Sequence, residues 1–248
     1  MPFSSNKILS LETVDSTNNY AMRLIQKGKA TSGNAVFSME QISGKGRRGK
    51  DWISKKGENI TLSVMVEMQW LGVFHQFQLS AVAALAAHDL VSKYVSLNTF
   101  IKWPNDIFIS DSKAGGVLIE NVLKGTLWQW AVVGIGINVN QTNFEAYDFS
   151  ATSLQKMTGK DYSVIKLAEE LHQLVLKRID ELKDGNFRKM LDEYNEKLYA
   201  KEKLVKLKEG NIVFETRITG VSPDGQLITH NALERRFNFD EVEFKGIV

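Results

Sequence analysis

The first half of the chain alternates between two hydrophobic periods, one typical of helices and one typical of strands. Apolar residues spaced at i, i+3 and i+4 predict a helix over 20–25 and a longer one over 74–94. Short apolar or alternating runs bounded by turn formers predict strands. These strands cover residues 8–11, 35–39, 60–68, 99–103, 107–109, 116–123 and 127–139. Consecutive strands without helices between them favour an α+β fold with a mixed or antiparallel central sheet and flanking helices.

The pattern changes toward the carboxyl end of the chain. Residues 162–182 and 187–199 have helical spacing and are separated by the breaker Asp184-Gly185-Asn186. From Leu204 onward, short strands alternate with turn formers, which predicts a small β-barrel. We therefore expect two domains, 1–200 and 201–248.

Residues 42–59 form a glycine- and lysine-rich span with little apolar periodicity, and long loops in compact domains are usually functional or disordered. Within it, Ser43-Gly44-Lys45-Gly46-Arg47-Arg48-Gly49-Lys50 alternates glycine with cations. Glycines allow positive φ, so several backbone N–H groups can turn toward one anion while the side chains supply charge. The spacing is not that of a Walker A loop. The alternatives are a solvated basic turn and a nucleic-acid patch.

Composition narrows the classes of protein. The chain has 248 residues, 43% apolar and 24% charged, which is close to average globular usage. Its 31 basic and 29 acidic residues are too balanced for a surface built to hold nucleic acid. The absence of cysteine excludes disulfides, Cys-ligated metal and an acyl group carried on a thiolate. Residues 1–10 have no export signal and no apolar run is long enough for a bilayer, so we expect a cytoplasmic protein without membrane contact.

Four further motifs have ordinary structural explanations when each is taken alone. Asp15-Ser16-Thr17-Asn18 can be a helix N-cap, and Lys102-Trp103-Pro104-Asn105-Asp106 can be the end of a strand. Lys113, placed in a polar turn before Ala114-Gly115-Gly116, can be a surface lysine. The run from Gly134 to Asn140 lacks the third glycine of a dinucleotide fingerprint.

Taken together and in this order, these motifs, with Gln41, Trp52 and the basic loop, resemble the biotin–protein ligase family over nearly the whole chain. The resemblance implies a catalytic domain similar to class II aminoacyl-tRNA synthetases and an SH3-like barrel at the carboxyl end. It also implies that MgATP and biotin give biotinyl-5′-AMP. Biotin then passes to a lysine of a biotin carboxyl carrier protein domain.

The resemblance assigns roles by position, with Lys113 and Arg47 as the catalytic residues. Those implied at biotin are Ser16, Thr17, Asn18, Gln41, Lys45, Gly46, Arg47, Lys113, Gly115 and Gly116. Those implied at ATP and its phosphates are Arg47, Arg48, Lys50, Trp52, Lys102, Asn105, Asp106 and Asn138. No metal is expected on protein ligands alone, and Mg²⁺ would arrive with ATP, near Asn138. Many family members have arginine where this chain has Lys45, which keeps the charge but loses the bidentate fork.

Three other functions are alternatives to this one. A lipoate–protein ligase has similar chemistry but needs an apolar tunnel in place of polar groups that read a urea. A DNA-binding repressor of this family carries an amino-terminal helix-turn-helix, whereas about seven residues precede the first strand here, so no DNA partner is expected. The terminal barrel could be a separate peptide-binding module. A homodimer is compatible with the sequence.

Overall fold

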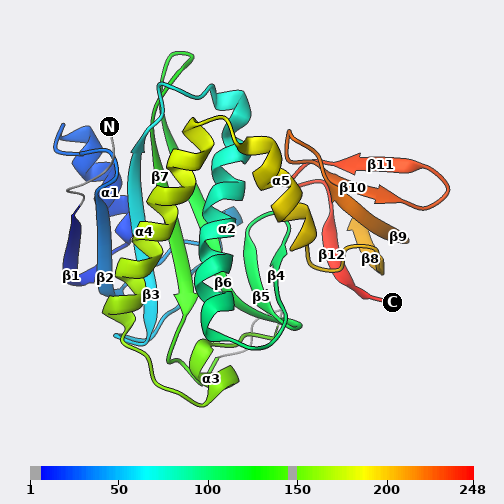
Figure 1. Ribbon diagram of the computed structural model, residues 1–248, viewed down its shortest axis with the longest axis horizontal. Coiled ribbons are helices and arrows are strands. Elements are labelled where there is room, and N and C mark those ends of the chain that lie inside the picture. The colour runs from blue at the N-terminus through cyan, green and yellow to red at the C-terminus, as the bar shows by residue number, and fades with distance from the viewer. Residues whose placement is uncertain (1–6, 145–149) are drawn as a thin grey trace.

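The computed structural model describes residues 7–144 and 150–248, which form two sheets and five α-helices (Figure 1). Residues 1–6, part of the segment in which we expected no export signal, lie outside this description. None of the described helices is long and apolar enough to cross a membrane.

The large sheet has seven strands in the order β1-β2-β3-β7-β6-β5-β4. β1 runs parallel to β2 and every other neighbouring pair is antiparallel, so the sheet is mixed, as predicted. The strands are β1 (Ile8–Val14), β2 (Ala35–Gln41), β3 (Asn59–Glu67), β4 (Thr99–Lys102), β5 (Asp106–Ile109), β6 (Ser112–Lys124) and β7 (Leu127–Asn138).

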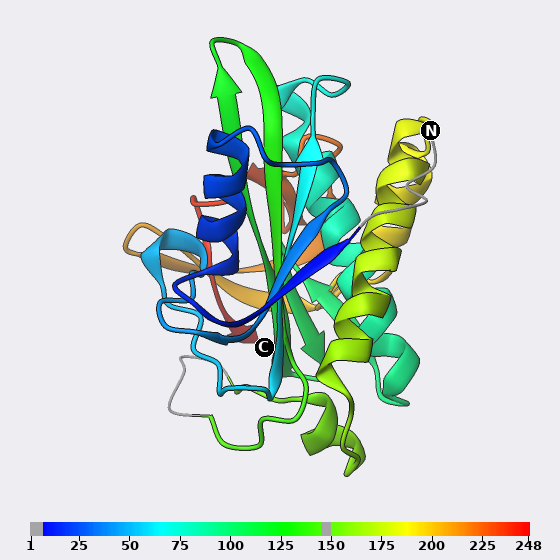
Figure 2. The same ribbon diagram turned by 90° about the vertical axis from the view of Figure 1, so that its left-hand side faces the viewer.

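Helices cover the two faces of this sheet unequally. α2 (Gln76–Tyr94) and α4 (Val164–Lys183) lie on one face, and α1 (Thr17–Gln26) lies on the other (Figure 2). The alanine-rich middle of α2 is fully buried, because small side chains let the helix lie close to both the sheet and α4. The α1 face has only a small apolar cluster, so part of this face is available for a binding site.

One expected turn is wrong. Lys113 was placed in a turn, but it is the second residue of β6, where it pairs with Phe108 of β5. The hairpin loop contains only Ser110 and Asp111, and Ser110 adopts a φ of 52°. Two-residue hairpin loops of this kind need a residue with positive φ, which glycine or asparagine usually provides. A serine at that position does not mark the loop in the sequence. The short helix α3 (Leu154–Thr158) was also missed.

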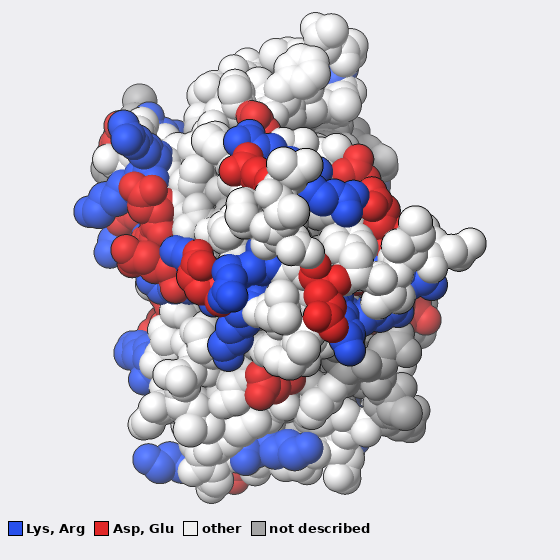
Figure 3. Space-filling model, turned by 90° about the vertical axis from the view of Figure 1, so that its right-hand side faces the viewer, with Lys and Arg blue, Asp and Glu red and all other residues white. Residues whose placement is uncertain are grey.

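The carboxyl-terminal strands form a separate antiparallel sheet in the order β11-β10-β9-β8-β12. They are β8 (Leu204–Glu209), β9 (Ile212–Val221), β10 (Leu227–His230), β11 (Glu234–Phe237) and β12 (Glu243–Ile247). Within the described residues no ladder joins β11 to β12, so the second sheet is confirmed while the small β-barrel expected for these strands is not. On the face that carries it, cations and carboxylates are interspersed (Figure 3).

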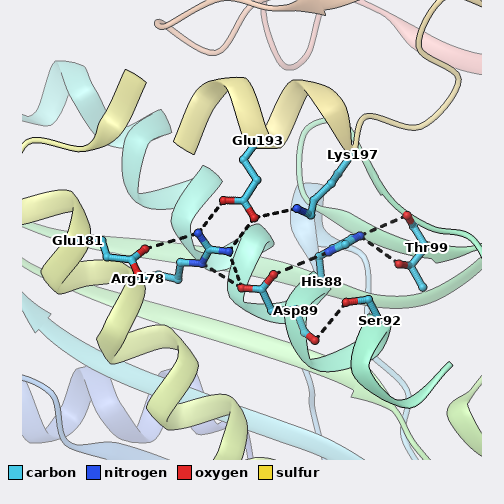
Figure 4. Close-up of polar contacts among 8 residues, drawn as sticks. All are labelled: His88, Asp89, Ser92, Thr99, Arg178, Glu181, Glu193 and Lys197. Atoms are coloured by element: carbon cyan, nitrogen blue, oxygen red, sulfur yellow. Dashed lines mark hydrogen bonds and ion pairs between the residues drawn. The ribbon is translucent and has the colours of Figure 1, made fainter. Parts of the chain in front are cut away.

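Helix α5 (Phe187–Glu196) connects the large sheet, the helices and the small sheet. Arg178 of α4 donates to Asp89 of α2 at 2.6 Å and to Glu193 of α5 at 2.7 Å (Figure 4). At the far side of α5, Asn195 donates to the carbonyl oxygen of Val221 in β9 and accepts from its N–H. The position of the small sheet is thus fixed through α5.

Candidate functional site

A cavity of about 710 Å³ lies on the α1 face of the large sheet, between α1, the basic loop and the small sheet. Strand alternation decides which residues reach it, because every second residue points to the same face. On β7 the cavity face carries Gly134, Gly136 and Asn138, while the side chains of Ile135, which also borders the cavity, and Ile137 belong to the core under α2. Because the cavity-facing residues of β7 are small or polar, they leave open space above the sheet that large apolar side chains would fill.

Two of these glycines are required by close packing. A Cβ at Gly136 would lie 2.5 Å from the indole ring of Trp52, which rests directly on β7. A Cβ at Gly134 would overlap the side-chain amide of Asn18. The Gly-x-Gly run was visible in the sequence, and its physical reason is the approach of these two side chains.

The amino end of α1 contributes buried polar groups. Ser16 is the N-cap residue but its side chain makes no capping bond, so ordinary capping does not explain this motif. Ser16, Thr17 and Asn18 are each at most 4% exposed. The N–H and the hydroxyl of Thr17 donate to Oε1 of Gln41 at 2.8 and 3.0 Å. Ser16, Thr17, Asn18 and Gln41 therefore make this end of the cavity polar without adding a formal charge.

The basic loop folds back on itself as a tight turn. Gly46 donates its N–H to the carbonyl oxygen of Lys50. The backbones of Lys45 and Asp51 form an isolated antiparallel β-bridge. Arg48 adopts a φ of 57°, and its guanidinium donates to Asp240 at 2.6 Å and to the carbonyl oxygen of Phe239 at 3.0 Å. The loop is therefore anchored on the turn between β11 and β12.

Arg47 points into the cavity. Its Nη1 donates to Oδ1 of Asn105 at 3.2 Å, and its guanidinium lies 5.3 Å from the centre of the Phe239 ring. Burial lowers the pKa of Arg47, and the nearby charge of Asp240 opposes that change. Arginine keeps its proton under these conditions, so Arg47 brings a fixed positive charge to the cavity.

Two lysines approach the same space from β4 and β6, the strands on either side of β5. Lys113 forms an ion pair of 2.7 Å with Asp106. Lys102 has its ammonium 4.8 Å from the centre of the Phe108 ring and 4.4 Å from that of Phe244. Burial lowers the pKa of Lys102 to about 8, with Asp106 opposing the change.

The structure brings together almost all residues that the sequence singled out. The cavity is lined by Ser16, Thr17, Asn18, Gln41, Lys45, Gly46, Arg47, Arg48, Lys50, Trp52, Lys102, Asn105, Asp106, Lys113, Gly116 and Asn138. Gly115 does not line it, because alternation along β6 turns this residue to the opposite face, beside Ile137. Asn138 donates to the carbonyl oxygen of Thr152, so its amide is partly engaged within the protein.

Other residues at the site escaped the sequence analysis. Phe239, Asp240 and Phe244 come from the carboxyl-terminal sheet, and sequence separation gives no sign that they meet the loop. Ser63 of β3 bonds both Thr17 and Asn18, and its place in an alternating strand was the available signal. Within the described residues, no group of three or more carboxylates and histidines is arranged to hold a metal ion.

Sequence comparison identifies several relatives. The chain is 33% identical to the bifunctional ligase/repressor BirA of Escherichia coli over 135 residues, 54% of this chain and 41% of that protein. It is 37% identical to the biotin–[acetyl-CoA-carboxylase] ligase of Paracoccus denitrificans over 132 residues, 52% of this chain and 53% of that protein. The matched part thus spans about half or less of each relative.

Solved structures share the fold over almost the full chain. The biotin protein ligase from Aquifex aeolicus, in complex with biotin and ATP, superimposes with a TM-score of 0.82 at 24% identity, covering 98% of this chain and 100% of that one. The enzyme from Leishmania major, in complex with biotinyl-5-AMP, gives a TM-score of 0.61 at 24% identity, covering 94% and 99%. The sequence model of the biotin/lipoate A/B protein ligase family matches residues 10–138, just over half of the chain. The chain belongs to the biotin/lipoate A/B protein ligase family.

Proposed function

We propose that the protein is a biotin–protein ligase, which activates biotin with MgATP and transfers it to a lysine of a biotin carboxyl carrier protein domain. The observation that supports this most directly is the convergence of Arg47 and Lys113 on one cavity whose other end is polar and neutral. Relatives and structural neighbours named as biotin ligases support the same assignment.

The cations meet the main electrostatic demand of the first step. A carboxylate must approach the α-phosphate of ATP, and two unit charges ~4 Å apart repel by roughly 4 kcal/mol at an effective dielectric of about 20. Arg47, Lys113 and Lys102, together with Mg²⁺ carried by the phosphates, offset this repulsion. The carboxylate oxygen then attacks the α-phosphorus and pyrophosphate leaves. We assign Arg48, Lys50, Trp52, Asn105, Asp106 and Asn138 to the nucleotide side of the cavity.

The polar end suits the ring system of biotin. An uncharged urea offers two donors and one acceptor, which small neutral side chains can match, whereas a buried unpaired charge would be costly. We assign Ser16, Thr17, Asn18 and Gln41 to this end, with Lys45, Gly46 and Gly116 toward the carboxylate.

In the second step the amine of the carrier lysine attacks the acyl carbon of the mixed anhydride and AMP leaves. The basic loop and Trp52 cover the cavity and would restrict hydrolysis by water. For the carboxyl-terminal strands we propose the SH3-like architecture of a small domain from about residue 201. We also propose that the enzyme works in the cytoplasm.

A lipoate–protein ligase is the closest alternative within the same family. Lipoate has an apolar dithiolane where biotin has a urea. The polar side chains of Ser16, Thr17 and Gln41 at this end of the cavity favour biotin, because an apolar dithiolane offers no partner to their remaining hydrogen-bonding groups. Calorimetry with both acids separates the two functions.

The direct test is pyrophosphate exchange into ATP that depends on biotin, followed by transfer to an isolated carrier domain. Arg47→Ala and Lys113→Ala should each slow the exchange by about 100-fold or more, because each removes a charge used in the transition state. Arg188→Ala and Lys189→Ala, exposed cations of α5, serve as controls with rates like the unmodified protein. A well-folded protein without biotin-dependent exchange would refute the proposal.

A further inference from the structure

A continuous series of polar contacts runs beneath the urea-binding end of the cavity. It begins at Gln41, which accepts from Thr17, and it continues to Ser63, whose hydroxyl lies 2.7 Å from Thr17 Oγ1 and 2.6 Å from Asn18 Oδ1. It ends at Glu120 of β6, whose Oε2 accepts from Asn18 Nδ2 at 2.8 Å. Ser63 and Glu120 are not among the residues that line the cavity, so neither contacts the space where a ligand lies.

Glu120 determines which way the Asn18 amide faces. The two ends of an asparagine amide have nearly the same shape but opposite hydrogen-bonding roles. A carboxylate accepts and does not donate, so it selects the orientation with Nδ2 toward Glu120 and Oδ1 toward Ser63. The carbonyl oxygen of Leu118, 3.4 Å from Nδ2, favours the same orientation.

The same orientation then passes along the series. Because Asn18 presents its oxygen to Ser63, the Ser63 hydroxyl acts as a donor there. The Thr17 hydroxyl has one proton for the two acceptors within its reach, the Ser63 oxygen at 2.7 Å and Gln41 Oε1 at 3.0 Å. The amide of Asn18 also lies against the backbone of Gly134, which leaves it little room to rotate to another position. One acceptor at the end of the series thus sets the hydrogen-bonding direction at Asn18 and at Ser63.

The second oxygen of Glu120 lies 3.7 Å from Nζ of Lys45 in the basic loop. This contact supplies a countercharge on the side away from Asn18. It also places Glu120 between the fixed end of the cavity, on the sheet, and the loop that covers the ligand.

We propose that Glu120 is a positioning residue for specificity, which fixes the hydrogen-bonding direction of Asn18 and so the ability of the site to read a urea. This inference rests on the proposed function. It predicts an effect on biotin binding, carried through Asn18, with little effect on the chemistry at Arg47 and Lys113.

The test uses Glu120→Leu and Glu120→Gln with pyrophosphate exchange as the readout. Leucine removes the acceptor, so the KM for biotin should rise about tenfold while kcat and the KM for ATP change little. Glutamine can still present an oxygen to Asn18, so it should restore most of the affinity for biotin. Glu12→Leu is the control, since Glu12 lies 3.9 Å from Lys56 in a similar ion pair away from the cavity.

A double-mutant cycle separates positioning from a general loss of structure. In an Asn18→Ala background, Glu120→Leu should cause no further rise in the KM for biotin, because its effect passes through the missing amide. Additive effects, equal impairment by glutamine and leucine, or an unchanged KM in a folded Glu120→Leu protein would each overturn the inference. Absence of biotin-dependent exchange in the unmodified protein would instead refute the proposed function.

Discussion

Two lysines that line the same cavity differ in their surroundings, since one faces a carboxylate and the other lies against aromatic rings. Lys113 faces the carboxylate of Asp106 at 2.7 Å. Lys102 is only 8% exposed and lies against aromatic rings, where burial lowers its pKa to about 8. The charge of Lys102 is therefore present at neutral pH and lost in mildly alkaline solution.

This difference predicts a pH dependence for nucleotide use. If Lys102 contacts phosphate, kcat/KM for ATP should fall as the pH rises through about 8, because that ratio reports groups of the free enzyme. Lys102→Arg should keep its activity to higher pH, since arginine stays protonated. Steady-state rates measured from roughly pH 6.5 to roughly pH 9.5, on both sides of a pKa of about 8, test this prediction. An identical alkaline decline in the arginine variant would show that another group titrates.

The sequence alone predicted which residues form the site, but not what surrounds their side chains. Lys113, Arg47 and Lys102 could be recognised because motifs carried them. Nothing in the motifs revealed that Lys102 would be enclosed by Phe108 and Phe244, since Phe244 comes from a strand far along the chain. Burial depends on tertiary packing, and hence so does the pKa.

The position of helix α5 depends on ion pairs as well as on apolar packing. Arg178 is 15% exposed at its side chain and bridges Asp89 and Glu193 (Figure 4). On α2, His88 lies beside Asp89, and its Nε2 is 3.2 Å from the carbonyl oxygen of Thr99 in β4. The helical periods were predictable from sequence, but this bridge was not, because its charged residues come from three separate helices.

Removing the central guanidinium should destabilise the fold. Arg178→Met should lower the free energy of unfolding by about 3 kcal/mol, because Asp89 and Glu193 would then face each other without a cation. Lys177→Met, which removes an exposed lysine 3.8 Å from Glu181, should cost about 0.5 kcal/mol or less. Urea denaturation measures both, and equal losses would contradict the special role of Arg178.

The same bridge predicts an acid-sensitive contribution to stability. Burial acts to raise the pKa of Glu193, but hydrogen bonds from Arg178 and Lys197 outweigh it and lower that pKa to about 2. The stabilisation is therefore complete above the unfolded pKa of about 4.3 and is lost as the pH falls toward 2. Glu193→Gln should flatten this part of the profile of melting temperature against pH. A slope like that of the unmodified protein would mean that other carboxylates dominate.

In the whole molecule, the site is completed by contacts between parts of the chain that lie far apart in sequence. Arg48 of the loop bonds Asp240 and the carbonyl oxygen of Phe239, and Trp103 donates to the carbonyl oxygen of Gly225. The α+β class and a separate set of carboxyl-terminal strands were predictable, because both follow from local periods. The open edge of the small sheet and its contact with the loop were not, since neither leaves a local pattern.

Loosening this contact should release the loop. Asp240→Ala should increase trypsin cleavage after Arg47 and Arg48 by about two- to fivefold, the range expected for an exposed ion pair. Glu234→Ala removes a carboxylate that pairs with Arg236 in the same sheet, away from the loop, and serves as the control. Cleavage at the same rate in both variants would show that Asp240 does not hold the loop.

The anchoring of the loop on residues 239–240 has a consequence for synthesis on the ribosome. The strands and helix that form the polar end precede residue 140, so this half of the pocket can fold while the chain is still growing. The opposite wall appears only after about a hundred more residues have emerged, several seconds later at ordinary rates of translation. A nascent chain should therefore form the polar end of the cavity first and the wall that anchors the loop last.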